Sequence, residues 1–268
     1  MKFLEGDLKM LNKLIKIDLR YILRLTPIFF GAGIFFALVS LVSSKIEGSA
    51  IAEIIKRISE NFALSAVISG IINVLSRAVG VFYKKLYGDE SYLTHTLPIS
   101  KKTIYLSKIL STLYSFLIAL FIGILILAIN YNLFENFETL KTFIETTAGM
   151  TGGNVTEFLV LIILVGFFEI TTLVSLIFLV MIIKNRTTKT KTALIAVGTY
   201  LAAQGTFLLS LFLIGIINPE VMELFNSEIV SSETMRLVFI DATIVYSVAT
   251  LIINMVNTKL LEKGVNVA

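Results

Sequence analysis

The sequence predicts an all-α membrane protein, with six transmembrane helices preceded by an amphipathic interfacial helix at the N-terminus. Of its 268 residues, 56% are hydrophobic and 16% are charged, whereas soluble proteins carry about 25% charged residues. A membrane-crossing helix needs roughly 20 apolar residues. Six segments qualify: 23–44, 62–83, 106–131, 157–183, 193–217 and 237–257. The stretches between them are too short to form cores of their own, so we expect one transmembrane domain over residues 1–268.

Apolar residues in segment 1–22 recur at spacings of three and four, which indicates a helix with one apolar stripe. The stripe consists of Leu4, Leu8, Leu11, Ile15, Leu19 and Ile22, and a basic stripe beside it of Lys9, Lys13, Lys16 and Arg20. We expect this helix to lie along the inner leaflet with its lysines near anionic headgroups; a regulatory or partner-binding role is the alternative. The charged region is too long for a cleavable signal peptide, so we expect the first crossing to be retained.

The basic residues predict the orientation of the bundle. With a cytoplasmic N-terminus, most of the 23 Lys and Arg residues fall inside. Those outside are Lys45, Lys56, Arg57, Lys141 and Arg236, and Arg77 lies within a crossing. This bias predicts a plasma-membrane protein with both termini in the cytoplasm and a cytoplasmic tail at 258–268. It also explains the pI of about 9.1, so we expect no nucleic-acid partner.

Two external segments carry apolar faces. The segment 45–60 follows the first crossing and has Ile51, Ile54, Ile55 and Ile58 on one face. In segment 132–156 the pattern suggests a surface helix with Phe134, Phe137, Leu140 and Ile144.

Small residues are concentrated in the second and fifth crossings. Lipid supplies no hydrophobic drive for helix association, so close helix contacts need small side chains. These crossings are therefore the candidates for the bundle interior or a subunit interface, through Ser69, Gly70, Asn73, Gly198, Ala202 and Gly205.

Polar groups within the crossings are candidates for a translocation path because they are costly in hydrocarbon. Glu169 is the deepest, Gln204 is central in the fifth crossing, Asp241 lies near an outer end, and Arg77 can extend to the inner surface. In the alternative interpretation, Glu169 stays neutral and hydrogen-bonds to Thr171, Thr172 or a neighbouring helix.

Enzymatic and metal chemistry are not indicated. The chain has no Cys and one His, which excludes thiolate and His-cluster metal sites. No acid–nucleophile constellation accompanies His95, and the phosphate-binding pattern G-x-x-x-x-G-K-[ST] is absent. We therefore expect no ATP hydrolysis by this chain.

The segment 84–102 between the second and third crossings is dense in charge, hydroxyls and turn formers. Gly88-Asp89 is a turn signal, Pro98 interrupts the preceding helix, and Ser100 can cap the next one. These signals predict a helix–break–helix element on the cytoplasmic side.

The sequence Leu97-Pro98-Ile99-Ser100-Lys101, with Ile104, Leu106, Lys108 and Leu110, resembles the start of the third helix in ABC type-2 exporter permeases. The stretch from Gly88 to Pro98 is similar to a branch common in Gram-positive bacteria. The resemblance implies an ATP-driven exporter in which this subunit pairs with a second permease, identical or different. Two separate ATPase subunits would bind ATP and Mg.

In such permeases the loop between helices two and three is gripped by the ATPase, and helices two and five form the permease contact. Here the resemblance gives the coupling role to Tyr87, Gly88, Asp89, Glu90, Tyr92, Leu93, Thr94, His95, Thr96, Leu97 and Pro98. We expect a hydrophobic or amphipathic cargo, with a small peptide favoured, because the crossings offer few charges. The alternatives are an ion-coupled secondary carrier and a non-transporting sensor or immunity protein.

Overall fold

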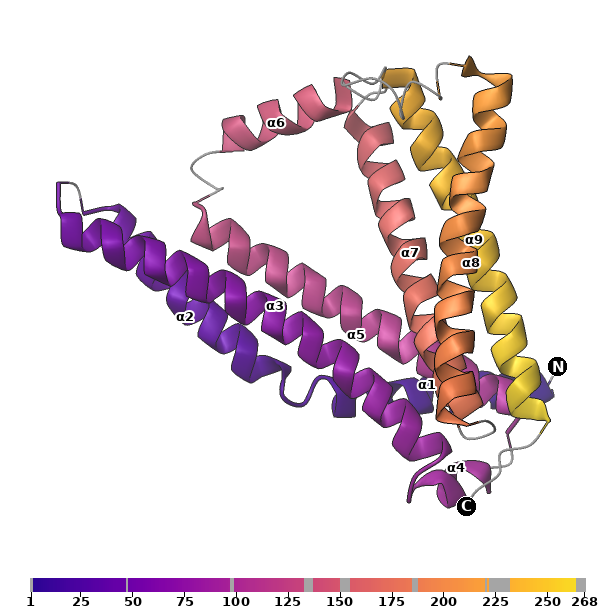
Figure 1. Ribbon diagram of the computed structural model, residues 1–268. Coiled ribbons are helices and arrows are strands. Elements are labelled where there is room, and N and C mark those ends of the chain that lie inside the picture. The colour runs from indigo at the N-terminus through magenta and orange to yellow at the C-terminus, as the bar shows by residue number, and fades with distance from the viewer. Residues whose placement is uncertain are drawn as a thin grey trace. The chain divides into compact units, whose positions relative to one another are not determined.

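In the computed structural model, the described residues form helices joined by turns and short connections (Figure 1). The structure describes residues 2–46, 48–96, 99–132, 137–149, 155–184, 188–219, 221 and 232–263, and no strand forms among them. The helices are α1 (Lys2–Ile22), α2 (Thr26–Ser44), α3 (Ala50–Leu86), α4 (Ser91–His95), α5 (Lys101–Asn130), α6 (Phe137–Gly149), α7 (Val155–Lys184), α8 (Lys189–Ile217) and α9 (Ser232–Glu262). Six of these, α2, α3, α5, α7, α8 and α9, are long and apolar enough to cross a membrane. The predicted fold class, a multi-pass all-α membrane protein, is confirmed.

The chain divides into two compact units, and each is described by itself. Unit 1, Met1–Phe137, contains α1 to α5, and unit 2, Glu138–Asn266, contains α6 to α9. The single transmembrane domain expected from the sequence stays a prediction.

The helix of the second crossing begins earlier than the apolar segment indicates. The Ser49 side chain accepts a hydrogen bond from the Ala52 backbone N–H and caps α3, which continues for 37 residues to Leu86. Most of the segment 45–60 thus forms the first turns of α3, and its external location stays a prediction. No proline interrupts these turns, and Glu53 and Arg57 form an ion pair of 2.6 Å along them. At 1.5 Å per residue, α3 is about 55 Å long, which exceeds the roughly 30 Å hydrocarbon core.

Small residues bring the three membrane helices of unit 1 together. Helices α2, α3 and α5 contact one another around a core that includes Ala37, Ala63, Ala78 and Ala119. At Gly70 of α3, an added Cβ would lie 2.8 Å from the ring of Phe30 on α2. Close approach at this position therefore requires glycine, and Gly70 faces the interior of unit 1.

Polar contacts join the helices of unit 2. The hydroxyls of Thr172 on α7 and Thr250 on α9 are 2.7 Å apart, and Asn257 Nδ2 donates to the Ser175 carbonyl at 2.9 Å. Near the start of both helices, Arg236 and Glu157 form an ion pair of 2.6 Å. The predicted surface helix between crossings three and four is present as α6, whereas Phe134 lies outside the described residues.

Candidate functional site

The connection between α3 and α5 is a tight turn, a short helix and a capped helix start. The Gly88 N–H donates to the carbonyls of Tyr83 and Lys84, at 3.1 and 3.2 Å, and closes α3. A Cβ at Gly88 would lie 3.0 Å from Lys84 Cα, so a larger residue would crowd this turn. Helix α4 follows at Ser91. The helix–break–helix element is present, and its cytoplasmic position stays a prediction.

Ser100 begins the next helix as the sequence predicts. Its side-chain oxygen accepts a hydrogen bond from the Thr103 N–H at 3.1 Å, which satisfies one of the unpaired amides at the start of α5. Leu97 and Pro98 lie outside the described residues, as do the side chains of Leu93 and His95.

Helix α4 has a buried side and an exposed side. Ser91 and Thr94 are buried, and the Thr94 hydroxyl donates to the Glu90 carbonyl at 3.3 Å. The Tyr92 side chain is 73% exposed, and Asp89 and Thr96 are also exposed. Tyr87, Gly88 and Glu90 are half-buried. Since an exposed aromatic side chain is a common anchor at protein interfaces, Tyr92 is the best placed to contact a partner among the loop side chains that the structure describes.

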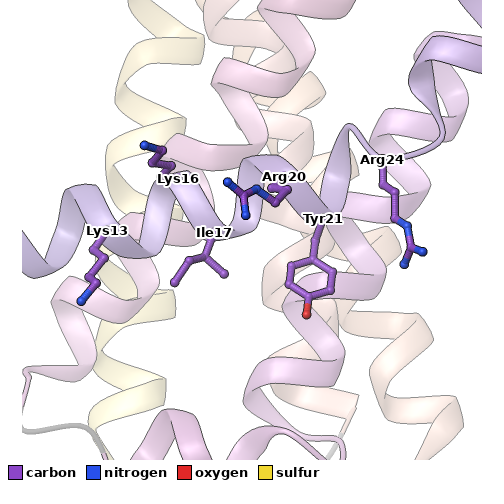
Figure 2. Close-up of a pocket in the computed structure, with 6 residues that line it drawn as sticks. All are labelled: Lys13, Lys16, Ile17, Arg20, Tyr21 and Arg24. Carbon is purple, nitrogen blue, oxygen red and sulfur yellow. The ribbon is translucent and has the colours of Figure 1, made fainter.

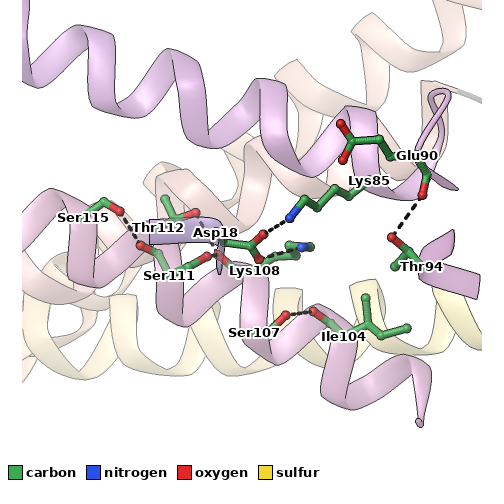
Figure 3. A network of polar contacts seen from close by, with 10 residues as sticks. All are labelled: Asp18, Lys85, Glu90, Thr94, Ile104, Ser107, Lys108, Ser111, Thr112 and Ser115. Atoms are coloured by element: carbon green, nitrogen blue, oxygen red, sulfur yellow. Dashed lines mark hydrogen bonds and ion pairs between the residues drawn. The ribbon is translucent and has the colours of Figure 1, made fainter. Parts of the chain in front are cut away.

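A buried carboxylate ties α1 to the two helices that flank α4 (Figure 3). Asp18 of α1 is fully buried, and its two oxygens accept hydrogen bonds from Lys85 near the end of α3 and Lys108 near the start of α5. Both N–O distances are 2.6 Å. The Lys85 ammonium also lies 5.0 Å from the centre of the Tyr21 ring. Any displacement between α3 and α5 at this end must therefore strain or break contacts with α1.

Helix α1 uses part of its apolar stripe for packing within unit 1. Ile15 and Ile22 are buried where α1 contacts α5 and α3, whereas Lys13, Lys16 and Arg20 are exposed. The amphipathic helix is thus present, with its apolar side toward protein over this part. Its interfacial location stays a prediction.

Two of the four translocation-path candidates meet in unit 2. Glu169 of α7 and Gln204 of α8 line a cavity with Tyr200 of α8 and Tyr246 of α9, whose hydroxyl donates to Gln204 Oε1 at 3.1 Å. The cavity volume of about 10 Å³ is close to that of a single water, so the cavity holds no cargo.

The other two path candidates, Asp241 and Arg77, do not line that cavity. Asp241 is buried and accepts a hydrogen bond from the Ser210 hydroxyl at 2.7 Å. Arg77 lines an open pocket of unit 1, of about 290 Å³, with Lys84, Lys85 and Glu90.

In the alternative interpretation Glu169 bonds to Thr171, Thr172 or a neighbouring helix, and both threonine hydroxyls donate elsewhere. The Thr171 and Thr172 hydroxyls donate to the Phe167 and Phe168 carbonyls, at 2.6 and 2.8 Å. Each hydroxyl bonds to the backbone carbonyl one turn earlier in α7. Both hydroxyls therefore donate to the backbone and not to Glu169. The Glu169 side chain is exposed on the surface of the described chain.

The interface candidates differ in their exposure. Gly198, Ala202 and Gly205 lie one turn apart along α8 and are exposed, with no atom within 4 Å of a Cβ built on either glycine. On α3, Ser69 is exposed and Asn73 is half-buried. The interface itself stays a prediction.

Sequence reasoning missed Asp18 and the polar face of α9. Asp18 lies between Ile15 and Ile22 on the apolar stripe of α1, where an isolated acid signals a buried ion pair. On α9, Tyr246, Thr250 and Asn254 recur every fourth residue within an apolar segment, which signals a polar seam between helices.

In the part of the chain that the structure describes, no group of three or more His, Asp or Glu residues could hold a metal ion. Comparison with family models, curated proteins and solved structures finds no match to this chain.

Proposed function

We propose that this chain is the membrane-spanning permease subunit of an ATP-driven ABC exporter. ATP and Mg bind to separate ATPase subunits, and a second permease completes the pathway. The proposal rests on the α3–α4–α5 element and on the resemblance of residues 88–110 to ABC type-2 permeases. Both termini and α4 then lie in the cytoplasm, as the basic residues predict.

The observation that carries the proposal is the attachment of α4 to the bundle. Helix α4 presents the exposed Tyr92, while Asp18, Lys85 and Lys108 fasten together the helices on either side of it. Force applied to α4 by a soluble partner reaches α3, α5 and α1 together, because buried ion pairs resist separation of their partners. A coupling element needs both features: an exposed surface that a partner can bind, and rigid contacts to the membrane helices.

The cargo we propose is hydrophobic or amphipathic, with a small peptide favoured. The spans carry few charged groups, and the Glu169 cavity has room for about one water. A polar solute would find few partners within these helices. Glu169 is exposed within the apolar length of α7 and remains the residue to test for a role in transport.

A site-specific cross-link tests the assignment. The chain contains no cysteine, so Tyr92→Cys gives a unique thiol on α4 for a maleimide photo-cross-linker. We expect cross-linking to an ABC ATPase expressed with it from the source organism. Tyr131→Cys is the matched control, because Tyr131 is exposed at the opposite end of α5.

The result also separates the competing functions. A cross-link to an ATPase from position 92 but not from position 131 supports the exporter. A secondary carrier or a non-transporting sensor needs no ATPase. If the reconstituted protein transports cargo but neither position 92 nor position 131 cross-links to an ATPase, the proposal is contradicted.

A further inference from the structure

We propose that the exposed face of α1 holds a binding site for an anionic phospholipid headgroup. The inference does not depend on the exporter assignment. It rests on an open pocket of about 590 Å³ lined by Lys13, Lys16, Ile17, Arg20, Tyr21 and Arg24 (Figure 2).

The pocket concentrates positive charge without a balancing acid. Four of its six lining residues are cations and none is a carboxylate. Between Met10 and Arg24 the only acid is Asp18, and its oxygens are engaged by Lys85 and Lys108 on the opposite, buried side of α1. Because Asp18 is paired with Lys85 and Lys108, it does not neutralise the four cations of the pocket. These cations can therefore bind an external anion.

The arginines suit a phosphate in particular. Arg20 and Arg24 are four residues apart and line the same pocket. A guanidinium donates in a planar fork that matches the oxygens of a phosphate, and the two lysines add compact charges at the other end of the pocket.

The position and the apolar part of the pocket favour a lipid over a soluble anion. Arg24 precedes the first helix able to cross a membrane, which begins at Thr26, so we expect this end of α1 at the level where hydrocarbon meets headgroups. Ile17 and Tyr21 are 42% and 46% exposed among the cations. Tyrosine is enriched at this boundary, where its ring meets acyl chains and its hydroxyl meets water. A free phosphate would leave this apolar surface uncovered.

Fluorescence quenching tests the site in the full-length protein. The chain has no tryptophan, so Tyr21→Trp introduces one reporter at the pocket and keeps an aromatic ring beside Lys85. The protein is reconstituted in phosphatidylcholine vesicles, and brominated phosphatidylglycerol or brominated phosphatidylcholine is added as the quencher. Because each basic residue near a membrane surface strengthens binding to anionic lipid about fivefold, we expect at least about a fivefold preference for phosphatidylglycerol.

Two charge variants identify the residues responsible. Replacing Lys13, Lys16, Arg20 and Arg24 together by Gln in the Tyr21→Trp background should reduce the preference to about one. The control replaces Lys45, Lys56 and Arg57 of unit 1 by Gln, none of which lines the pocket, and should retain the preference. All four pocket cations are exposed, so their loss leaves the core intact, and size-exclusion elution confirms this.

Several results would overturn the assignment. Equal quenching by the two lipids, or a preference that survives removal of the four cations, would show that the pocket does not select anionic headgroups. Relief of quenching by inorganic phosphate would identify the ligand as a free anion. Absence of quenching by either lipid would place this face of α1 against protein.

Discussion

The Asp18 carboxylate lies 2.6 Å from the Lys108 ammonium, and neither side chain is more than 2% exposed. Lys85, which is 12% exposed, pairs with the other Asp18 oxygen. The three residues come from α1, α3 and α5, so a single carboxylate joins three helices at the end of unit 1 that carries α4.

Mutation of Asp18 should lower the stability of the protein more than mutation of Lys108. Asp18→Asn leaves Lys85 and Lys108 without their counter-charge, and breaking a buried pair costs about 3–5 kcal/mol. Lys108→Met leaves Asp18 paired with Lys85 and should cost less. The measurement is the thermal unfolding midpoint of the purified protein in detergent.

A double-mutant cycle then isolates the contact. If Asp18→Asn lowers stability chiefly because it leaves the buried Lys108 charge without a partner, adding Lys108→Met should recover part of the lost stability. Additive losses from the two substitutions would contradict the bridging role of Asp18.

Gly70 and Gly80 of α3 provide a matched pair for helix packing. Gly70→Ala places a Cβ 2.8 Å from the Phe30 ring, whereas nothing lies within 4 Å of a Cβ at Gly80. We expect Gly70→Ala to cost about 1–3 kcal/mol through overpacking, and Gly80→Ala to be neutral or slightly stabilising, because Ala favours helix over Gly. The measurement is the thermal unfolding midpoint of each variant. Equal midpoints would be inconsistent with the contact between Gly70 of α3 and Phe30 of α2.

The sequence predicts the helices more completely than their contacts. Hydropathy locates all six spans because roughly 20 apolar residues are needed to cross the bilayer. The capped start of α5 and the tight turn at Gly88 follow from local residue chemistry. The crossing predicted at 62–83 is only part of α3, since a cap at Ser49 and an ion pair between Glu53 and Arg57 extend the helix beyond its apolar stretch.

A local pattern can signal that Asp18 is paired, but it cannot identify the partners. Lys85 and Lys108 are 67 and 90 residues away, and the positive-inside rule accounts equally well for both lysines. The same holds for Thr172 and Thr250, which are 78 residues apart and meet only because α7 packs against α9.

Thr171 and Thr172 of α7 offer a test of that polar seam. Both are buried, but Thr171 donates only within its own helix, whereas Thr172 also meets Thr250. Thr172→Val should lower stability by about 0.6–1.7 kcal/mol, the range for interhelical hydrogen bonds in membranes. Thr171→Val should have a smaller effect. The comparison uses unfolding midpoints in detergent, and a reversed order would show that the Thr172–Thr250 contact adds no stability.

Glu169 should matter for transport more than for stability. Its side chain is exposed and neighbouring hydroxyls donate elsewhere, so we expect Glu169→Gln to leave the unfolding midpoint unchanged. Cargo efflux from reconstituted vesicles then reports its functional role. Unchanged efflux would remove Glu169 from the translocation path, and a large loss of stability would show that it is part of the packing of unit 2.

The most direct test of the proposed coupling is ATP turnover in a reconstituted complex of this chain with the proposed ATPase. Asp89→Ala and Tyr92→Ala are combined in one variant, because Asp89 in the turn before α4 and Tyr92 on α4 are both exposed. Tyr131→Ala is the control. We predict that the double variant retains its fold but loses permease-stimulated ATP turnover, while the control retains it. Full stimulation in the double variant would contradict coupling through α4.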